Sequence, residues 1–170
     1  MIGPDTLASV WERHILDAGQ LAALAEGPEW VDLGSGAGLP GLVIAALKPG
    51  CRVTLVEKDR RKSAFLRHAA HAMQLPVTVL PQRIDEAAPT LRADVVTARA
   101  LAPLETLLRY AEPLLRQGAI GLFPKGRGYA AELTKARESW QFEAELAPSR
   151  TDPEARIVII RRLGQNEATR

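Results

Sequence analysis

Three glycines at alternate positions, Gly34, Gly36 and Gly38, make the stretch 30–41 a candidate ligand-binding loop. The stretch opens with a short apolar run, which is typical of a buried strand, and an apolar segment at 42–47 follows it. Because glycine has no side chain, the backbone there can turn tightly and approach a ligand closely. A strand, a glycine loop and a helix start also direct backbone amide donors toward one place. The pattern therefore predicts a loop that holds a small ligand.

Two kinds of ligand fit this loop. Gly36, Gly38 and Gly41 satisfy the dinucleotide pattern G-x-G-x-x-G, so a nicotinamide cofactor is one interpretation. Asp32 favours another, because a carboxylate at the end of the strand suits an ammonium group better than a pyrophosphate. The pattern Asp-x-Gly-x-Gly-x-Gly resembles the first motif of the class I methyltransferases, which bind S-adenosyl-L-methionine. The candidate cofactor contacts in the loop are Asp32, Gly34, Ser35, Gly36, Gly38 and Leu39.

Further candidates follow the predicted strands, because ligands of open α/β sheets lie beyond the carboxyl ends of the strands. Glu57 follows the second strand, and its carboxylate suits the ribose hydroxyls of either cofactor. Ile84 and Asp85 follow the third strand, where they could contact an adenine ring and its amino group. Two structural alternatives stay open. Glu57 could only pair with Lys58 or Arg61, and Asp85 could be a helix cap.

Basic residues follow the fourth and fifth strands. Arg99 emerges from a buried strand and must find a partner or water, so we expect it in the site, where it orients a carboxylate or a carbonyl group. Lys125 and Arg127 flank a glycine and are the candidates for binding nucleic acid, with residues 60–62 as an extension of the patch. An ordinary exposed turn is the alternative for Lys125 and Arg127.

His14 and Asp17 lie three residues apart, on one side of a predicted N-terminal helix. That helix could fold over the ligand edge of the sheet. His14 could then pair with Asp17 or orient the bound methionine group, and we count it as a substrate-site candidate. A solvated polar face is the alternative.

A regular alternation of short apolar runs and amphipathic stretches positions these residues. The predicted strands are 29–33, 52–56, 77–80, 93–97, 119–123, 140–146 and 156–162. The predicted helices are 5–25, 39–48, 59–73, 103–115 and 129–138. The buried stripe of the third helix is expected to comprise Phe65, Leu66, Ala69, Ala70 and Met73.

This order predicts an α/β fold with a mostly parallel seven-stranded sheet and helices on both faces. The two closing strands have no long helix between them, which indicates an antiparallel hairpin at one edge. The arrangement resembles the Rossmann-like sheet of class I S-adenosylmethionine-dependent methyltransferases. We predict an N-terminal helical segment at 1–28, the methyltransferase domain at 29–163 and a frayed tail at 164–170.

The bulk composition fits one globular domain. The chain has 170 residues, 46% of them hydrophobic, and a formal net charge of +2, which permits a nucleic-acid partner without demanding one. Cys51 is the single cysteine, and neither an apolar leader nor a run long enough to span a membrane is found. We expect a cytoplasmic, monomeric protein with no metal site and no membrane partner.

Two sequence absences narrow the chemistry. No Asn/Asp-Pro-Pro-Tyr segment follows the fourth strand, and that segment serves methyltransferases that act on exocyclic amines. No cysteine stands there for covalent attack on a pyrimidine ring. A nucleophile with its own lone pair, such as guanine ring nitrogen 7, needs neither device. Catalysis then needs alignment and stabilisation of the moving charge.

Four segments in order carry a closer resemblance: Arg13–Asp17, Asp32–Gly41, Ala98–Ala100 and Lys125–Gly126. Together they resemble the small-subunit ribosomal RNA guanine-N7 methyltransferase family, RsmG, also called glucose-inhibited division protein B. The resemblance implies methyl transfer from S-adenosyl-L-methionine to a guanine in the decoding-region loop of bacterial 16S rRNA, within the small ribosomal subunit or its precursor.

The resemblance also implies cofactor contacts at Gly34, Leu39, Ile84, Asp85 and Arg99. Two departures from the family pattern are expected to matter for RNA docking or for cover of the cofactor. Ala18 stands where the family often has serine, and the helical segment usual before the Arg-His motif does not precede it here.

Three other functions stay open. A small-molecule methyltransferase would show no basic surface near the cofactor mouth. A nicotinamide-dependent oxidoreductase would need a proton donor, and His14, His68 and His71 give no evident one. A ribosome-binding domain could keep the fold without turnover.

Overall fold

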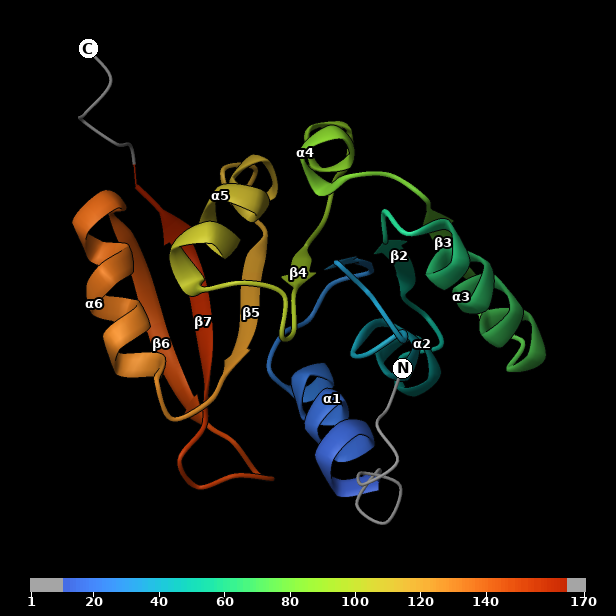
Figure 1. The fold of residues 1–170 in the computed structure, drawn as a ribbon, viewed down its shortest axis with the longest axis horizontal. Helices are drawn as coiled ribbons and strands as arrows, with labels where there is room; N and C mark the ends of the chain where they lie inside the picture. Colours follow the sequence, from blue (N-terminus) through green and yellow to red (C-terminus); the bar gives the residue numbers. More distant parts are fainter. Residues whose placement is uncertain (1–10, 165–170) are drawn as a thin grey trace.

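The computed structural model describes residues 11–164 and contains one seven-stranded sheet (Figure 1). The strands are β1 (Glu29–Leu33), β2 (Arg52–Val56), β3 (Val77–Leu80), β4 (Val95–Thr97), β5 (Ile120–Lys125), β6 (Phe142–Pro148) and β7 (Arg156–Leu163). Their order across the sheet is β3-β2-β1-β4-β5-β7-β6. The first five pair in parallel, whereas β7 runs antiparallel to both β5 and β6. The predicted mixed sheet with an antiparallel hairpin at one edge is confirmed.

Helices connect the parallel strands. They are α2 (Gly41–Leu47), α3 (Arg60–Ala72), α4 (Ile84–Ala87), α5 (Leu104–Leu115) and α6 (Tyr129–Ser139), with a 3₁₀ turn at Ala88–Thr90. The N-terminal helix, predicted as one element over 5–25, has three conformations in its described part. They are a π-helical turn at Trp11–Leu16, α1 (Asp17–Gly19) and a 3₁₀ turn at Gln20–Ala23. The predicted positions before residue 11 and after residue 164 lie outside the described residues.

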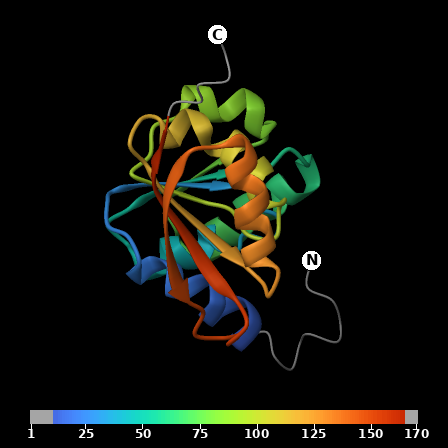
Figure 2. The ribbon, with the colours of Figure 1, turned by 90° about the vertical axis from the view of Figure 1, so that its left-hand side faces the viewer.

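Alternate side chains of each strand enter two different cores, as the two-residue period of a strand requires. On β1, Trp30 packs with α2 and α3, whereas Val31 and Leu33 pack with α5 and α6. The helices therefore cover both faces of the sheet, which the two perpendicular views show (Figures 1 and 2). Among residues 11–164, no helix has both the length and the apolar character that a membrane span requires.

The buried face of α3 is narrower than predicted. Ser63, Leu66 and Ala70 are buried, but Phe65 and Met73 are 52% and 51% exposed. The helix lies near the β3 edge of the sheet, where it contacts that strand (Figure 1). Only positions spaced by three and four residues reach the sheet from there. The prediction that Phe65 and Met73 belong to the buried stripe is wrong.

The strand order reverses between β1 and β4. From β1 the chain proceeds outward through β2 to β3, and then crosses back to β4 on the other side of β1. Asp32 and Thr97 lie side by side in the register of these two strands. A crevice is expected beyond the carboxyl ends of strands at such a point, and the candidate site lies there.

Candidate cofactor site

The three loop glycines have three different surroundings. All have positive φ, at +69° for Gly34, +56° for Gly36 and +87° for Gly38. A Cβ on Gly34 would lie 2.7 Å from Leu101, and one on Gly38 would lie 2.4 Å from Leu42. A Cβ on Gly36 would meet nothing closer than the Gly34 carbonyl oxygen at 3.8 Å. Gly36 is therefore the loop glycine that faces open space.

The amide donors of the loop are used within the protein. The amides of Gly34 and Ser35 donate to the Val56 carbonyl oxygen at 2.9 and 3.1 Å. The Gly36 amide donates to Glu57 Oε2 at 2.9 Å. A pyrophosphate would need these donors and would meet the Glu57 carboxylate instead. The geometry thus disfavours a dinucleotide in this loop.

Asp32 lies beneath the loop and does not line the cavity, contrary to the prediction that it faces an ammonium group of the ligand. Its side chain points to the α2 face of the sheet, where Oδ1 accepts from Thr97 Oγ1 at 2.9 Å and Oδ2 from the Gly41 amide at 3.3 Å. It is 1% exposed, and burial raises its pKa to about 6. Asp32 therefore holds the loop to the neighbouring strand and to α2.

Glu57 stands at the end of β2 and is 7% exposed. Its second carboxylate oxygen, Oε1, accepts from the Asp59 amide at 2.8 Å. Within the described residues it forms no ion pair with Lys58 or Arg61, which was the structural alternative. A buried carboxylate at the edge of a cavity is placed to accept hydrogen bonds from hydroxyl groups of a ligand.

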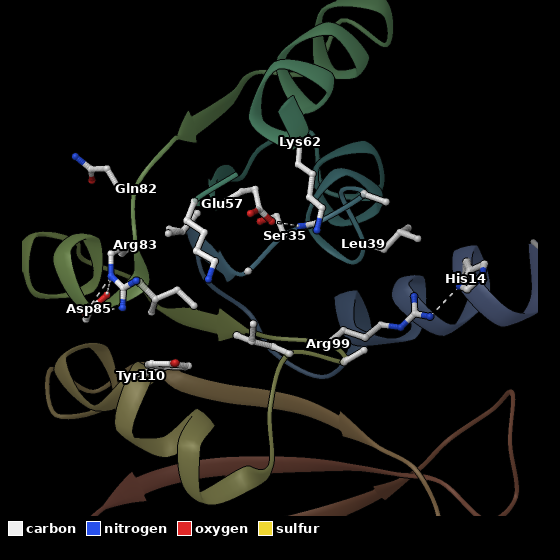
Figure 3. A pocket seen from close by; sticks show the side chains of 18 residues that line it. His14, Ser35, Leu39, Glu57, Lys62, Gln82, Arg83, Asp85, Arg99 and Tyr110 are labelled. Atoms are coloured by element: carbon white, nitrogen blue, oxygen red, sulfur yellow. Dashed lines mark hydrogen bonds and ion pairs between the residues drawn. The ribbon is translucent and has the colours of Figure 1, made fainter. Parts of the chain in front are cut away.

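A cavity of about 600 Å³ lies over the loop, within the range typical of small-molecule sites (Figure 3). Nine of the predicted site residues line it: His14, Gly34, Ser35, Gly36, Leu39, Glu57, Ile84, Asp85 and Arg99. Four do not line it: Asp32, Gly38, Lys125 and Arg127. Sequence reasoning gave no cavity role to several others that do: Ala37, Val56, Lys58, Lys62, Gln82, Arg83, Ala100, Leu101 and Tyr110.

The two ends of the cavity differ in character. Arg83 and Asp85 face one another at one end, whereas Arg99 and His14 lie at the other, with Glu57 between them (Figure 3). Asp85 lies inside the first turn of α4 rather than at its cap, and it pairs with Arg83 at 3.1 Å. That guanidinium lowers the pKa of the Asp85 carboxyl.

Arg99 joins the loop after β4 to the N-terminal helix. Its Nε lies 3.2 Å from Asp17 Oδ2, and its NH2 group lies 2.8 Å from His14 Nδ1. Asp17 also accepts a hydrogen bond from Thr151 Oγ1, at 2.9 Å. The next residue, Ala100, has φ of +50°, a conformation that is costly for alanine and recurs at functional sites.

The structure corrects the setting predicted for Lys125 and Arg127. Lys125 is the last residue of β5 and is 8% exposed, because its ammonium group donates to the Ala102 carbonyl oxygen at 2.6 Å and pairs with Glu132 at 2.7 Å. Arg127 is exposed and pairs with Glu154 at 3.6 Å. Neither presents an unopposed charge at the mouth of the cofactor cavity.

A second cavity, of about 910 Å³, adjoins the first. Both are lined by His14, Arg99, Ala100 and Leu101, so these residues mark the boundary between them. Lys125 lines the second cavity, on the side opposite the glycine loop. The arrangement offers two neighbouring compartments, as a transfer between two bound molecules requires.

The sequence matches the family model described as rRNA small subunit methyltransferase G over residues 1–155. The chain belongs to this family. A protein named ribosomal RNA small subunit methyltransferase G in Methylorubrum extorquens is 52% identical over 97% of this chain and 81% of its own length. The protein of that name in Caulobacter vibrioides is 47% identical over 97% of this chain and 77% of its own length.

Solved structures show the same fold at low sequence identity. A predicted O-methyltransferase from Agrobacterium tumefaciens has a TM-score of 0.70 and 22% identity, over 88% of this chain and 81% of that chain. MtNAS in complex with S-adenosylmethionine has a TM-score of 0.71 and 20% identity, over 94% of this chain and 66% of that chain. The predicted class I methyltransferase fold is confirmed.

Proposed function

We propose that this member of the rRNA small subunit methyltransferase G family transfers a methyl group from S-adenosyl-L-methionine to nitrogen 7 of a guanine in the decoding-region loop of 16S rRNA. The substrate is the small ribosomal subunit or its precursor, and the enzyme acts as a cytoplasmic monomer. The observation that carries the proposal is the pair of adjoining cavities at the reversal point of the sheet, with Arg99 on their boundary.

The first cavity fits the cofactor by its chemistry. Glu57 would accept hydrogen bonds from the ribose, Ile84 would contact the adenine ring and Asp85 would accept from its amino group. The methionine part would then extend past Gly36 toward Arg99, whose guanidinium suits a carboxylate. Gly36 supports this placement, because its Cβ position is open toward the cavity.

The second cavity would take the guanine. Bound S-adenosyl-L-methionine supplies a methyl group activated by its sulfonium. The lone pair of guanine nitrogen 7 forms the new bond to the methyl carbon, and the electrons of the old bond stay on sulfur. No proton leaves the guanine in this step, so the protein supplies alignment rather than a base.

Arg99 would orient the reactants, since a guanidinium keeps its proton throughout. It is itself held by Asp17 and His14. The product guanine carries extra positive charge, so Arg99 should contact the methionine carboxylate or the guanine carbonyl oxygen and not face nitrogen 7 directly.

The charge around the cofactor cavity favours RNA over a small molecule. Lys58, Lys62 and Arg83 line its wall, and the exposed Arg60 and Arg61 lie beside them in sequence. A basic surface at the mouth is what a polyanionic substrate requires and what the small-molecule alternative does not predict.

The direct test incubates the protein with S-adenosylmethionine labelled in its methyl group and with small subunits that lack the modification. The label should appear in 16S rRNA, and chemical cleavage at 7-methylguanine should place it at one guanine of the decoding-region loop. Already modified subunits and large subunits are the controls. Tight binding to subunits without transfer would instead indicate the non-catalytic alternative.

A further inference from the structure

The segment 57–73, which contains α3, has an unusual charge balance. It holds five basic residues, Lys58, Arg60, Arg61, Lys62 and Arg67, and two acidic ones, Glu57 and Asp59. All five basic residues are exposed. Both acids are engaged elsewhere, since Glu57 is buried and Asp59 caps α3 by accepting from two backbone amides. The side chains therefore leave a cluster of positive charge on this helix.

Basic residues elsewhere in the described chain are mostly neutralised. Ion pairs compensate Lys48, Arg52, Arg83, Arg99, Arg116, Lys125, Arg127, Lys135 and Arg161. Within residues 11–164, none of the five basic residues at 58–67 forms such a pair. Charge that is left uncompensated over one helix indicates an anionic partner.

The helix spacing arranges these groups in two rows on the outer face of α3. Arg60, Arg67 and His71 fall in one row, with Arg60 and Arg67 about 10 Å apart along the axis. Arg61, Phe65 and His68 fall in the other row. Phe65 is therefore an exposed aromatic ring among cations.

The face continues into the cofactor cavity. Lys62, in the first turn of α3, lines the cavity and points toward the glycine loop in the close view (Figure 3). A chain lying along α3 would thus reach the rim of the cavity without crossing an acidic surface formed by α3 itself.

We propose that the outer face of α3 is an RNA-docking surface that grips the rRNA strand beside the target guanine. This inference rests on the proposed function. The guanidinium groups of Arg60, Arg61 and Arg67 contact phosphates, for which their planar donor geometry is well suited. Phe65 stacks on an unpaired base, because an aromatic ring accepts any base face.

The test compares the wild type with R60Q/R61Q/R67Q and with F65A. Glutamine keeps a long polar side chain and a good helix propensity, so α3 should persist. The dissociation constant for small subunits, measured across salt concentrations, should rise at least tenfold in the triple variant. Its log–log salt slope should become shallower by about 2, at roughly 0.7 per lost contact to a single strand. F65A should weaken binding with an unchanged slope.

The matched control is R92Q/R116Q/R162Q, which removes the same charge near the amino end of β4, after α5 and near the far end of β7, away from the cavity mouth. It should bind like the wild type, and both triple variants should bind S-adenosylmethionine normally by calorimetry. Equal subunit affinities and salt slopes for the two triple variants would overturn the inference.

Two further outcomes separate the possible failures. If the α3 variant loses affinity for subunits but binds protein-free 16S rRNA like the wild type, the partner is a ribosomal protein, and the inference is overturned. If the wild type transfers no methyl group to small subunits, the proposed function fails. Direct binding measurements would still report on the α3 surface in that case.

Discussion

At the scale of single residues, Asp32 shows how a site can rest on a group that does not touch the ligand. Its carboxylate is buried between β4 and α2, and burial raises its pKa to about 6 although three hydrogen bonds act in the opposite direction. The charged form is therefore disfavoured in the folded state. The folded protein takes up a proton at Asp32 at a higher pH than the unfolded chain does.

This gives a prediction for stability. Between about pH 4 and 6 the folded state binds more protons at Asp32, so its contribution to the free energy of unfolding falls as pH rises and levels off near pH 7. Asp32→Asn cannot ionise. The difference in free energy of unfolding between Asp32→Asn and wild type should therefore shift toward the variant by up to about 3 kcal/mol over this range. Urea unfolding from pH 4 to 7.5 measures it, and a pH-independent difference would contradict the assignment.

Gly36 carries a second prediction. Its positive φ strains any branched residue, and its Cβ direction opens into the cavity. Gly36→Val should cost roughly 1–2 kcal/mol of stability and weaken S-adenosylmethionine binding at least tenfold, because the side chain would occupy the ligand's space. Calorimetry on the folded variant measures the affinity. A dissociation constant equal to that of the wild type would move the cofactor away from this loop.

At the scale of elements, the N-terminal helix and the β6–β7 connection hold Arg99 from two sides. Asp17 pairs with Arg99 and also accepts from Thr151, which lies between β6 and β7. The ion pair is largely shielded, since the two side chains are 18% and 19% exposed. We infer that Asp17 is a positioning residue, acting through the orientation of Arg99.

Asp17→Asn should lower the single-turnover methyl transfer rate about 10- to 100-fold, as expected when a reactant loses its alignment. Asp17→Glu should recover part of the rate, and Thr151→Val should cost little because the ion pair stays. Arg99→Ala should lose most transfer, and His14→Ala less. A normal rate for a folded Asp17→Asn protein would show that the pair serves stability alone.

The elements themselves show what a sequence can predict. The predicted strand at 52–56 matches β2, and Glu57 was found because it follows that strand. α4 was missed, since its four residues are too short to show a helical period. Phe65 was assigned to the core on its apolarity, whereas the position of α3 near the sheet edge leaves it exposed. Tyr110 gave no signal, because only the packing of α5 brings it to the cavity.

At the scale of the whole molecule, the topology gathers the site from distant parts of the chain. His14, Gly36, Glu57, Asp85 and Arg99 line one cavity because β1, β2, β3 and β4 end at the same edge of the sheet. Sequence reasoning could predict this gathering from the alternation of strands and helices. It could not predict that Lys125 turns inward, because that depends on Glu132 arriving from α6.

The central claim is that the cavities align guanine nitrogen 7 for a transfer that needs no catalytic base. The most direct measurement is the single-turnover rate of methyl transfer on pre-bound small subunits between pH 6.5 and 8.5. This account predicts a nearly constant rate, since no group must lose a proton in the chemical step. A rate that climbs about tenfold per pH unit would require a catalytic base and would contradict it.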